Sequence, residues 1–243
     1  MKKENVLFIC LPILCVVAAI ISYLAVINKE PTNEDALKFK EEYEALNGTV
    51  VFDDLKYSNL EISENNPIKY SDYDELLDVI ENESGIIYLG FPECPWCRSA
   101  LPILFEVVKD NDINTIYYLN IKNDRDSYIV EDGKLVYELD ENGKEKKGAK
   151  GYFKLMDALD KHLTDYIVSF EDKEYDTKEK RIYAPTVVFV REGKVLGLHV
   201  STVESQKSGF DKMTDKQKDE LYGIYEEYIL EMKNSSCSKD DAC

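Results

Sequence analysis

Ile86-Ile-Tyr-Leu-Gly-Phe-Pro-Glu-Cys94-Pro-Trp-Cys97 carries the clearest structural signal in this chain of 243 residues. Its first half, Ile86 to Phe91, is a nearly continuous apolar run, which is typical of a central strand covered on both faces. The run from Arg98 to Lys109 has the pattern of a helix, and Pro95 suits the first turn of that helix. A strand that leads into a helix through Cys-x-x-Cys is the arrangement that a redox-active dithiol needs.

The position of Cys94 at the predicted helix N-terminus favours its thiolate form. Unpaired backbone N–H groups and the positive end of the helix dipole both stabilise a negative charge there. Cys97 lies almost one helical turn further on and can attack a mixed disulfide formed at Cys94. We therefore predict that Cys94 is the nucleophile, that Cys97 is the resolving thiol, and that oxidation joins them in a Cys94–Cys97 disulfide.

The same Cys-x-x-Cys spacing also serves as half of a zinc site. The sequence holds no second Cys-x-x-Cys and no Cys/His pair at ligand spacing. We therefore predict no metal site and no cofactor. Trp96, the single tryptophan, lies between the two cysteines, where we expect it to contact substrate and to shield the thiols. The Pro-Trp dipeptide itself leaves the direction of electron flow open.

Two further segments resemble the thioredoxin family. The helix sequence from Cys97 through Pro102 to Val107 is similar to that family's active-site helix, including its kinking proline. Ala184-Pro185-Thr186, followed by a predicted β-hairpin that reaches Val195, is similar to the family's cis-proline loop. The resemblance implies an α/β thioredoxin-like fold over residues 67–233, a central mixed sheet flanked by helices. It also implies a cis bond before Pro185 and substrate contacts at Ala184, Pro185 and Thr186.

The distance in sequence from Cys97 to Pro185 is about twice that of a minimal thioredoxin, so we expect an insertion at about residues 122–176. Within it, apolar residues at helical spacing predict one helix face: Tyr152, Leu155, Met156, Leu159, Leu163 and Tyr166. Two interpretations stay open, a lid or docking surface and a purely structural addition.

The chain departs from the family pattern at two charged positions. Tyr88 stands where thioredoxins usually carry a buried aspartate, and Tyr118 stands where they carry a lysine. Proton transfer from Cys97 must then use water or another group. Glu93, directly before Cys94, could raise the pKa of that thiol, and Arg98 could offset the effect.

A candidate membrane span precedes the domain. Val6 to Ile27 is free of charges and long enough to cross a bilayer, and it lacks a convincing cleavage site or lipobox. We therefore predict a signal anchor over residues 1–28, with a linker and N-terminal extension over residues 29–66. The flanking charges favour a single-pass protein of the cell membrane whose C-terminal domain is extracytoplasmic. The composition suggests a bacterial source.

The last residues, 234–243, form a polar tail that contains Cys237 and Cys243. These two cysteines are either a second dithiol that shuttles electrons to the first or a Cys237–Cys243 disulfide closed within the tail. We favour the tail disulfide.

Together these features predict a protein-disulfide oxidoreductase. Its expected partners are exported proteins with thiols or disulfides, together with a membrane redox donor or acceptor. The net charge of −18 argues against nucleic acid as a partner. The alternative is a non-catalytic binding or assembly module with the same fold, such as a bacteriocin-transport accessory protein.

Overall fold

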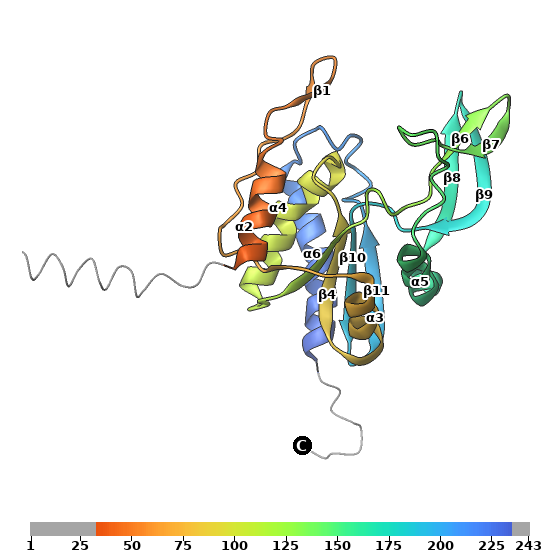
Figure 1. Ribbon diagram of the computed structural model, residues 1–243. Helices are drawn as coiled ribbons and strands as arrows, with labels where there is room; N and C mark the ends of the chain where they lie inside the picture. The colour runs from red at the N-terminus through yellow and green to blue at the C-terminus, as the bar shows by residue number, and fades with distance from the viewer. Residues whose placement is uncertain (1–32, 235–243) are drawn as a thin grey trace, which may run out of the picture.

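The centre of the molecule is a five-stranded mixed sheet, seen in a computed structural model that describes residues 33–234 (Figure 1). The strand order is β11-β10-β4-β5-β3. β3 and β4 run parallel to β5, whereas β10 runs antiparallel to β4 and β11. The strands span Ile68–Tyr70 (β3), Gly85–Gly90 (β4), Ile116–Asn120 (β5), Thr186–Arg191 (β10) and Lys194–Val200 (β11). This mixed α/β architecture is consistent with the expected thioredoxin-like fold.

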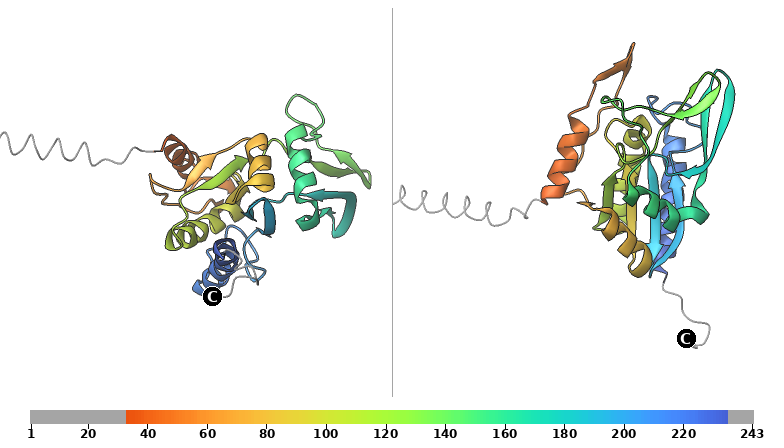
Figure 2. Two further views of the ribbon diagram at one scale, coloured as in Figure 1. Left: turned by 90° about the horizontal axis from the view of Figure 1, so that it is seen from below. Right: turned by 45° about the vertical axis from the view of Figure 1, so that its right-hand side comes forward.

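Helices cover both faces of the sheet (Figure 2). One face carries α2 (Glu34–Glu44), α4 (Pro95–Asp110) and α6 (Asp215–Lys233), and the other carries α3 (Tyr73–Asn82) and α5 (Lys150–Leu159). Along β4, Ile86 and Tyr88 pack in the first core, whereas Ile87 and Leu89 pack in the second. Because successive side chains of a strand point to opposite faces, this double burial requires apolar residues at nearly every position.

The domain begins earlier in the chain than in the sequence prediction, which assigned residues 29–66 to a linker and N-terminal extension. Phe39 and Tyr43 of α2 are fully buried, in the same core as the side chains of α4. Leu60 and Ile62, further along the segment, join that core. The segment belongs to the fold because its apolar side chains complete the first face of the sheet.

A short hairpin follows α2. It pairs β1 (Val50–Phe52) with β2 (Leu55–Lys56), and it projects beyond the end of the sheet at which α4 begins (Figure 1).

The predicted insertion at residues 122–176 is not a single block. α5, which comes from its middle, lies beside α3 and buries Leu155 and Leu159 with side chains of the sheet, so this helix is a layer of the fold itself. The additional chain forms two antiparallel hairpins, one before and one after α5. They pair β6 (Tyr128–Glu131) with β7 (Lys134–Tyr137), and β8 (Thr164–Phe170) with β9 (Lys173–Arg181).

α5 also ends earlier than its apolar spacing suggested. A 3-10 turn, Asp160–His162, follows Leu159, and Tyr166 lies in β8. The pairing of β8 with the long strand β9 decides this boundary, because the segment is rich in β-branched and aromatic residues that favour a strand.

None of the helices within residues 33–234 is long and apolar enough to span a bilayer. The predicted anchor at Val6 to Ile27 and the tail cysteines Cys237 and Cys243 lie outside the described residues.

The burial of α2 can be tested by substitution in the full chain. Phe39→Ala should lower the free energy of unfolding by about 3–5 kcal/mol, because it leaves a cavity in the core shared with α4. Urea denaturation followed by circular dichroism measures the change. Glu41→Ala, at an exposed position of the same helix, is the matched control and should change stability by less than about 0.5 kcal/mol. Equal effects of the two substitutions would contradict the placement of α2.

Candidate active site

The turn between β4 and α4 carries both cysteines. Cys94 is the N-cap of α4, and its sulfur accepts a hydrogen bond from the backbone N–H of Cys97 over 3.1 Å. Its own N–H donates to the carbonyl of Phe91, which closes the turn. Both cysteines are free thiols, with Cys94 5% exposed and Cys97 fully buried. Cys94 is therefore the thiol that a substrate can reach.

A loop from the other end of the chain meets this turn. The Ala184–Pro185 peptide bond is cis, and the Cys94 thiol donates to the carbonyl of Ala184 over 3.3 Å. The loop arrives there because Thr186, the first residue of β10, pairs with Leu89 near the end of β4. The predicted substrate loop and the dithiol are thus brought together by the register of two neighbouring strands.

The three residues of this loop differ in what they offer a substrate. Ala184 is half-buried, whereas Pro185 and Thr186 are buried. The Thr186 hydroxyl donates to the carbonyl of Tyr183 over 2.7 Å, so it is engaged within the protein. The substrate contact at Thr186 that the resemblance implies stays a prediction, and with the hydroxyl engaged in this way it would involve the backbone of Thr186.

Trp96 lies half-buried at the start of α4, beside the first-face core. The loop between β11 and α6 passes close to it, and the Ser99 hydroxyl donates to the carbonyl of Gly209 in that loop. A Cβ atom at Gly209 would lie 2.7 Å from the backbone nitrogen of Trp96, so the approach requires glycine. Part of Trp96 stays exposed next to the dithiol, as a substrate contact requires.

The two thiols differ in acidity. The hydrogen bond with Cys97 lowers the pKa of Cys94 most, and burial opposes this effect. The backbone N–H of Cys97 and the positive charge of Arg125 lower the pKa of Cys94 further. Burial raises the pKa of Cys97 well above its ordinary value, and the neighbouring Cys94 raises it again. The site is therefore arranged for a thiolate at Cys94 and a protonated thiol at Cys97.

Neutral hydroxyl groups lie beneath Cys97. The hydroxyls of Tyr43 and Tyr88 are 3.2 Å apart, and the ring of Tyr88 stacks on that of Tyr118. A Cβ atom at Gly90 would lie 2.7 Å from the Tyr88 hydroxyl and 3.0 Å from the Cys97 sulfur, so the two groups flank the same glycine. Burial raises the pKa of all three tyrosines, which keeps them protonated.

Glu93 and Arg98 do not act as the sequence suggested. The Glu93 carboxylate pairs with Lys122 over 2.7 Å. The buried Arg98 guanidinium donates to backbone carbonyls, among them that of Tyr43 at 2.7 Å and that of Ser58. These hydrogen bonds of Arg98 join α4 to the N-terminal segment, and they do not involve the Cys94 thiol.

Sequence reasoning missed Arg125, which follows β5. Its guanidinium lies 4.9 Å from the centre of the Phe91 ring, next to the turn that carries Cys94. No motif marks this residue. The available signal was its place after β5, because the carboxyl ends of parallel neighbours such as β4 and β5 meet at one edge of the sheet.

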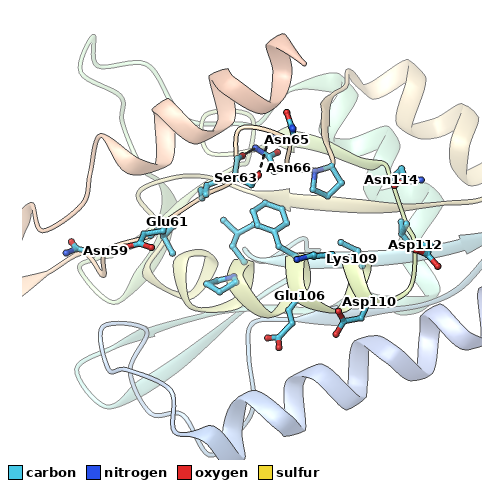
Figure 3. A pocket seen from close by; sticks show the side chains of 18 residues that line it. Asn59, Glu61, Ser63, Asn65, Asn66, Glu106, Lys109, Asp110, Asp112 and Asn114 are labelled. Atoms are coloured by element: carbon cyan, nitrogen blue, oxygen red, sulfur yellow. Dashed lines mark hydrogen bonds between the residues drawn. The ribbon is translucent and has the colours of Figure 1, made fainter. Parts of the chain in front are cut away.

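One groove of the molecule lies apart from the dithiol. It has a volume of about 1040 Å³ and runs between α4 and the segment that includes Asn59 and Asn66, and its lining includes neither cysteine (Figure 3). A second cavity of about 980 Å³ lies on the Arg125 side and is lined by Phe91, Arg125, Asp126 and Arg181 among others. Within residues 33–234, no three His, Cys, Asp or Glu side chains gather where they could hold a metal ion.

Comparisons with known proteins add little to this geometry. No protein-family model and no curated protein matches the sequence. Among solved structures, thioredoxin O2 from Arabidopsis thaliana in its oxidized state is similar over 57% of this chain and 85% of its own, with 14% identity and a TM-score of 0.30. A similarity with this TM-score and identity carries no functional argument.

The acidity of Cys94 leads to a pH-dependent prediction. Because its pKa is lowered, the thiolate persists at pH values at which a free cysteine, with a pKa of about 8.5, is protonated. Iodoacetamide should therefore modify the reduced native protein at Cys94 first. The pH at which the rate reaches half its maximum should lie below the corresponding pH for free cysteine. Peptide mapping identifies the modified site, and Cys94→Ser is the control. Faster modification of Cys97, or a midpoint at or above that of free cysteine, would contradict the assignment.

The Tyr88 hydroxyl should affect the second thiol selectively. It lies next to Cys97 across Gly90 and lowers the pKa of that thiol, although burial has the larger, opposite effect. Tyr88→Phe should therefore slow the attack of Cys97 on a mixed disulfide at Cys94, and leave the first attack by Cys94 nearly unchanged. Stopped-flow kinetics with a model disulfide separates the two steps. Tyr225→Phe removes a buried hydroxyl that has no hydrogen-bond partner in the described structure, and serves as control. Equal slowing by both substitutions would refute the role of Tyr88.

Proposed function

We propose that this protein is a thiol-disulfide oxidoreductase that exchanges disulfides with polypeptide substrates. The observation that carries the proposal is the pairing of an acidic thiol at Cys94, the less buried of the two, with a fully buried, protonated thiol at Cys97, beside the loop at Pro185. Perturbed thiol pKa values of opposite sign, within one helical turn, are what the two steps of disulfide exchange require.

In the reducing direction the reaction runs through a mixed disulfide. The Cys94 thiolate attacks one sulfur of the substrate disulfide, a Cys94–substrate S–S bond forms, and the other substrate sulfur leaves as a thiolate that takes a proton from water. Cys97 then loses its proton and attacks the sulfur of Cys94, which releases the second substrate thiol and leaves the Cys94–Cys97 disulfide. The Tyr88 hydroxyl stabilises the Cys97 thiolate during this second step. The same steps in reverse oxidise a substrate dithiol.

The surface beside the dithiol supports a polypeptide as substrate. The hairpin β1–β2 exposes Val50, Val51 and Phe52, and Phe52 is 69% exposed. This hairpin is joined to the active-site turn, because the Tyr57 hydroxyl just after β2 donates to the carbonyl of Glu93. Clustered apolar side chains of this kind are typical of protein interaction sites.

The location of the protein is part of the same proposal. An anchor at Val6 to Ile27 would fix the domain to the outer face of a bacterial cell membrane. Disulfides form and persist in that compartment, so exported proteins with thiols or disulfides are the proposed substrates. A membrane redox donor or acceptor would return Cys94 and Cys97 to their starting state. The tail cysteines, Cys237 and Cys243, form a separate disulfide in this scheme.

Trapping of substrates tests the proposed function. Cys97→Ser removes the resolving thiol, so mixed disulfides at Cys94 should accumulate in cells and disappear on reduction. Non-reducing electrophoresis followed by mass spectrometry identifies them. The double variant Cys94→Ser, Cys97→Ser should trap nothing, whereas Cys237→Ser, Cys243→Ser combined with Cys97→Ser should trap as before.

If Cys97→Ser traps no partner, and if Cys94→Ser retains full biological function, the protein would instead be a non-catalytic binding or assembly module.

A further inference from the structure

A group of charges, two of them buried and one half-buried, lies on the Arg125 side of the active site. Asp126 is 1% exposed, and its carboxylate lies 3.5 Å from the guanidinium of Arg181, which is 8% exposed. Arg125 is the third member, from the same segment after β5. The group holds two guanidinium groups and one carboxylate, of which Arg181 and Asp126 face each other, so it carries one positive charge in excess.

Several polar atoms of this group lack a hydrogen-bond partner within residues 33–234. Nε of Arg125, one terminal nitrogen of Arg181 and both carboxylate oxygens of Asp126 are buried without a hydrogen-bond partner among the described residues. Burial of a charge without compensation is costly, so an anion near the excess positive charge would stabilise the group.

The other charged side chains around the adjoining cavity are already paired or exposed. Lys122 pairs with Glu93, Lys146 with Glu138, and Lys147 with Glu145. Lys144, Asp140 and Glu141 lie at the exposed rim of the cavity, and Glu179, which faces Asp126 from β9, is exposed to solvent. Solvent screens these rim charges, so none of them neutralises Arg125 effectively.

Arg125 lies beside the turn that carries the dithiol. Its guanidinium lies over the ring of Phe91, whose carbonyl accepts the hydrogen bond from the backbone N–H of Cys94. Burial lowers the pKa of Arg125, as does the charge of Arg181, and negative charge on Cys94 or Cys97 raises it. The Cys94 thiolate is the anion that appears in this site when the disulfide is reduced.

We propose that Arg125 supplies the counter-charge of the Cys94 thiolate, so that the buried cluster favours the dithiol over the disulfide and makes the disulfide an oxidant of its substrates. This inference rests on the proposed function and gives it a direction. Arg125 acts through Cys94 and is a positioning residue.

The oxidising step balances as follows. A substrate dithiol loses two electrons and two protons as its own disulfide forms. The Cys94–Cys97 disulfide takes up the two electrons and one proton, which leaves a thiolate on Cys94 and a thiol on Cys97. The other proton passes to water, and the new charge on Cys94 is held by Arg125.

Charge substitutions of opposite sign provide the test. In the full chain, Arg125→Gln should shift the equilibrium with glutathione about tenfold toward the disulfide, equivalent to a reduction potential about 30 mV lower, and should raise the pKa of Cys94. Asp126→Asn removes a neighbouring negative charge. It should shift the equilibrium with glutathione toward the dithiol and lower the pKa of Cys94. The double variant should return close to the wild-type values, and Arg125→Lys should stay near them.

Two controls make the outcomes distinct. Lys144→Gln removes an exposed cation at the rim of the same cavity and should change the equilibrium less than twofold, because solvent screens that charge. Circular dichroism verifies that each variant is folded. If Arg125→Gln does not fold, the direction of the shift caused by Asp126→Asn, together with the near wild-type equilibrium expected for Arg125→Lys, still tests the proposal. Unchanged equilibria, or shifts of one sign for both substitutions, would overturn the role of Arg125. A wild-type protein without a glutathione-dependent disulfide would refute the proposed function instead.

Discussion

The pairing of β4 with β10 is the constraint on which the site depends. Because Leu89 lies opposite Thr186, the end of one strand and the beginning of its neighbour meet at the same edge of the sheet. The turn that follows β4 carries Cys94, and the loop that precedes β10 carries Ala184, so the thiol and the carbonyl come within 3.3 Å. A shift of the register by one residue would separate the loop from the thiol and turn every side chain of β10 to the opposite face.

The two cysteines at this edge of the sheet have different surroundings. Beneath Cys97 the protein offers buried aromatic rings and neutral hydroxyls, including those of Tyr43 and Tyr88, so nothing there favours a charge strongly. On the side of Cys94 lie the N-terminus of α4 and the guanidinium of Arg125. The hydrogen bond with Cys97 lowers the pKa of Cys94 most and burial raises the pKa of Cys97 most, and this asymmetry adds to the difference between the two thiols. It assigns their order in the reaction, and the hydroxyl that flanks Cys97 is that of the neutral Tyr88.

Features set by short-range pattern could be predicted from the sequence. The apolar run of β4, the proline at the first turn of α4 and the spacing of the cysteines are local, and each lies where it was expected. Long-range packing could not be predicted in the same way. Nothing in the spacing of α2 shows that Phe39 fills the core beside α4, or that α5 is a layer of the fold and not part of an insertion. Arg125 carries no motif, and its influence arises only when β4 and β5 align.

A redox titration of the full chain tests the central claim most directly. The protein is equilibrated in glutathione buffers, quenched with acid, and analysed by intact mass and peptide mapping. For the peptides that contain Cys94 and Cys97 we predict one two-electron transition, in which these two thiols together lose two hydrogen atoms and form a disulfide with each other. The peptide that contains Cys237 and Cys243 is followed separately. Thiols that stay reduced between about −120 and −300 mV, or a stable glutathione adduct on Cys94 with no internal disulfide, would contradict the account.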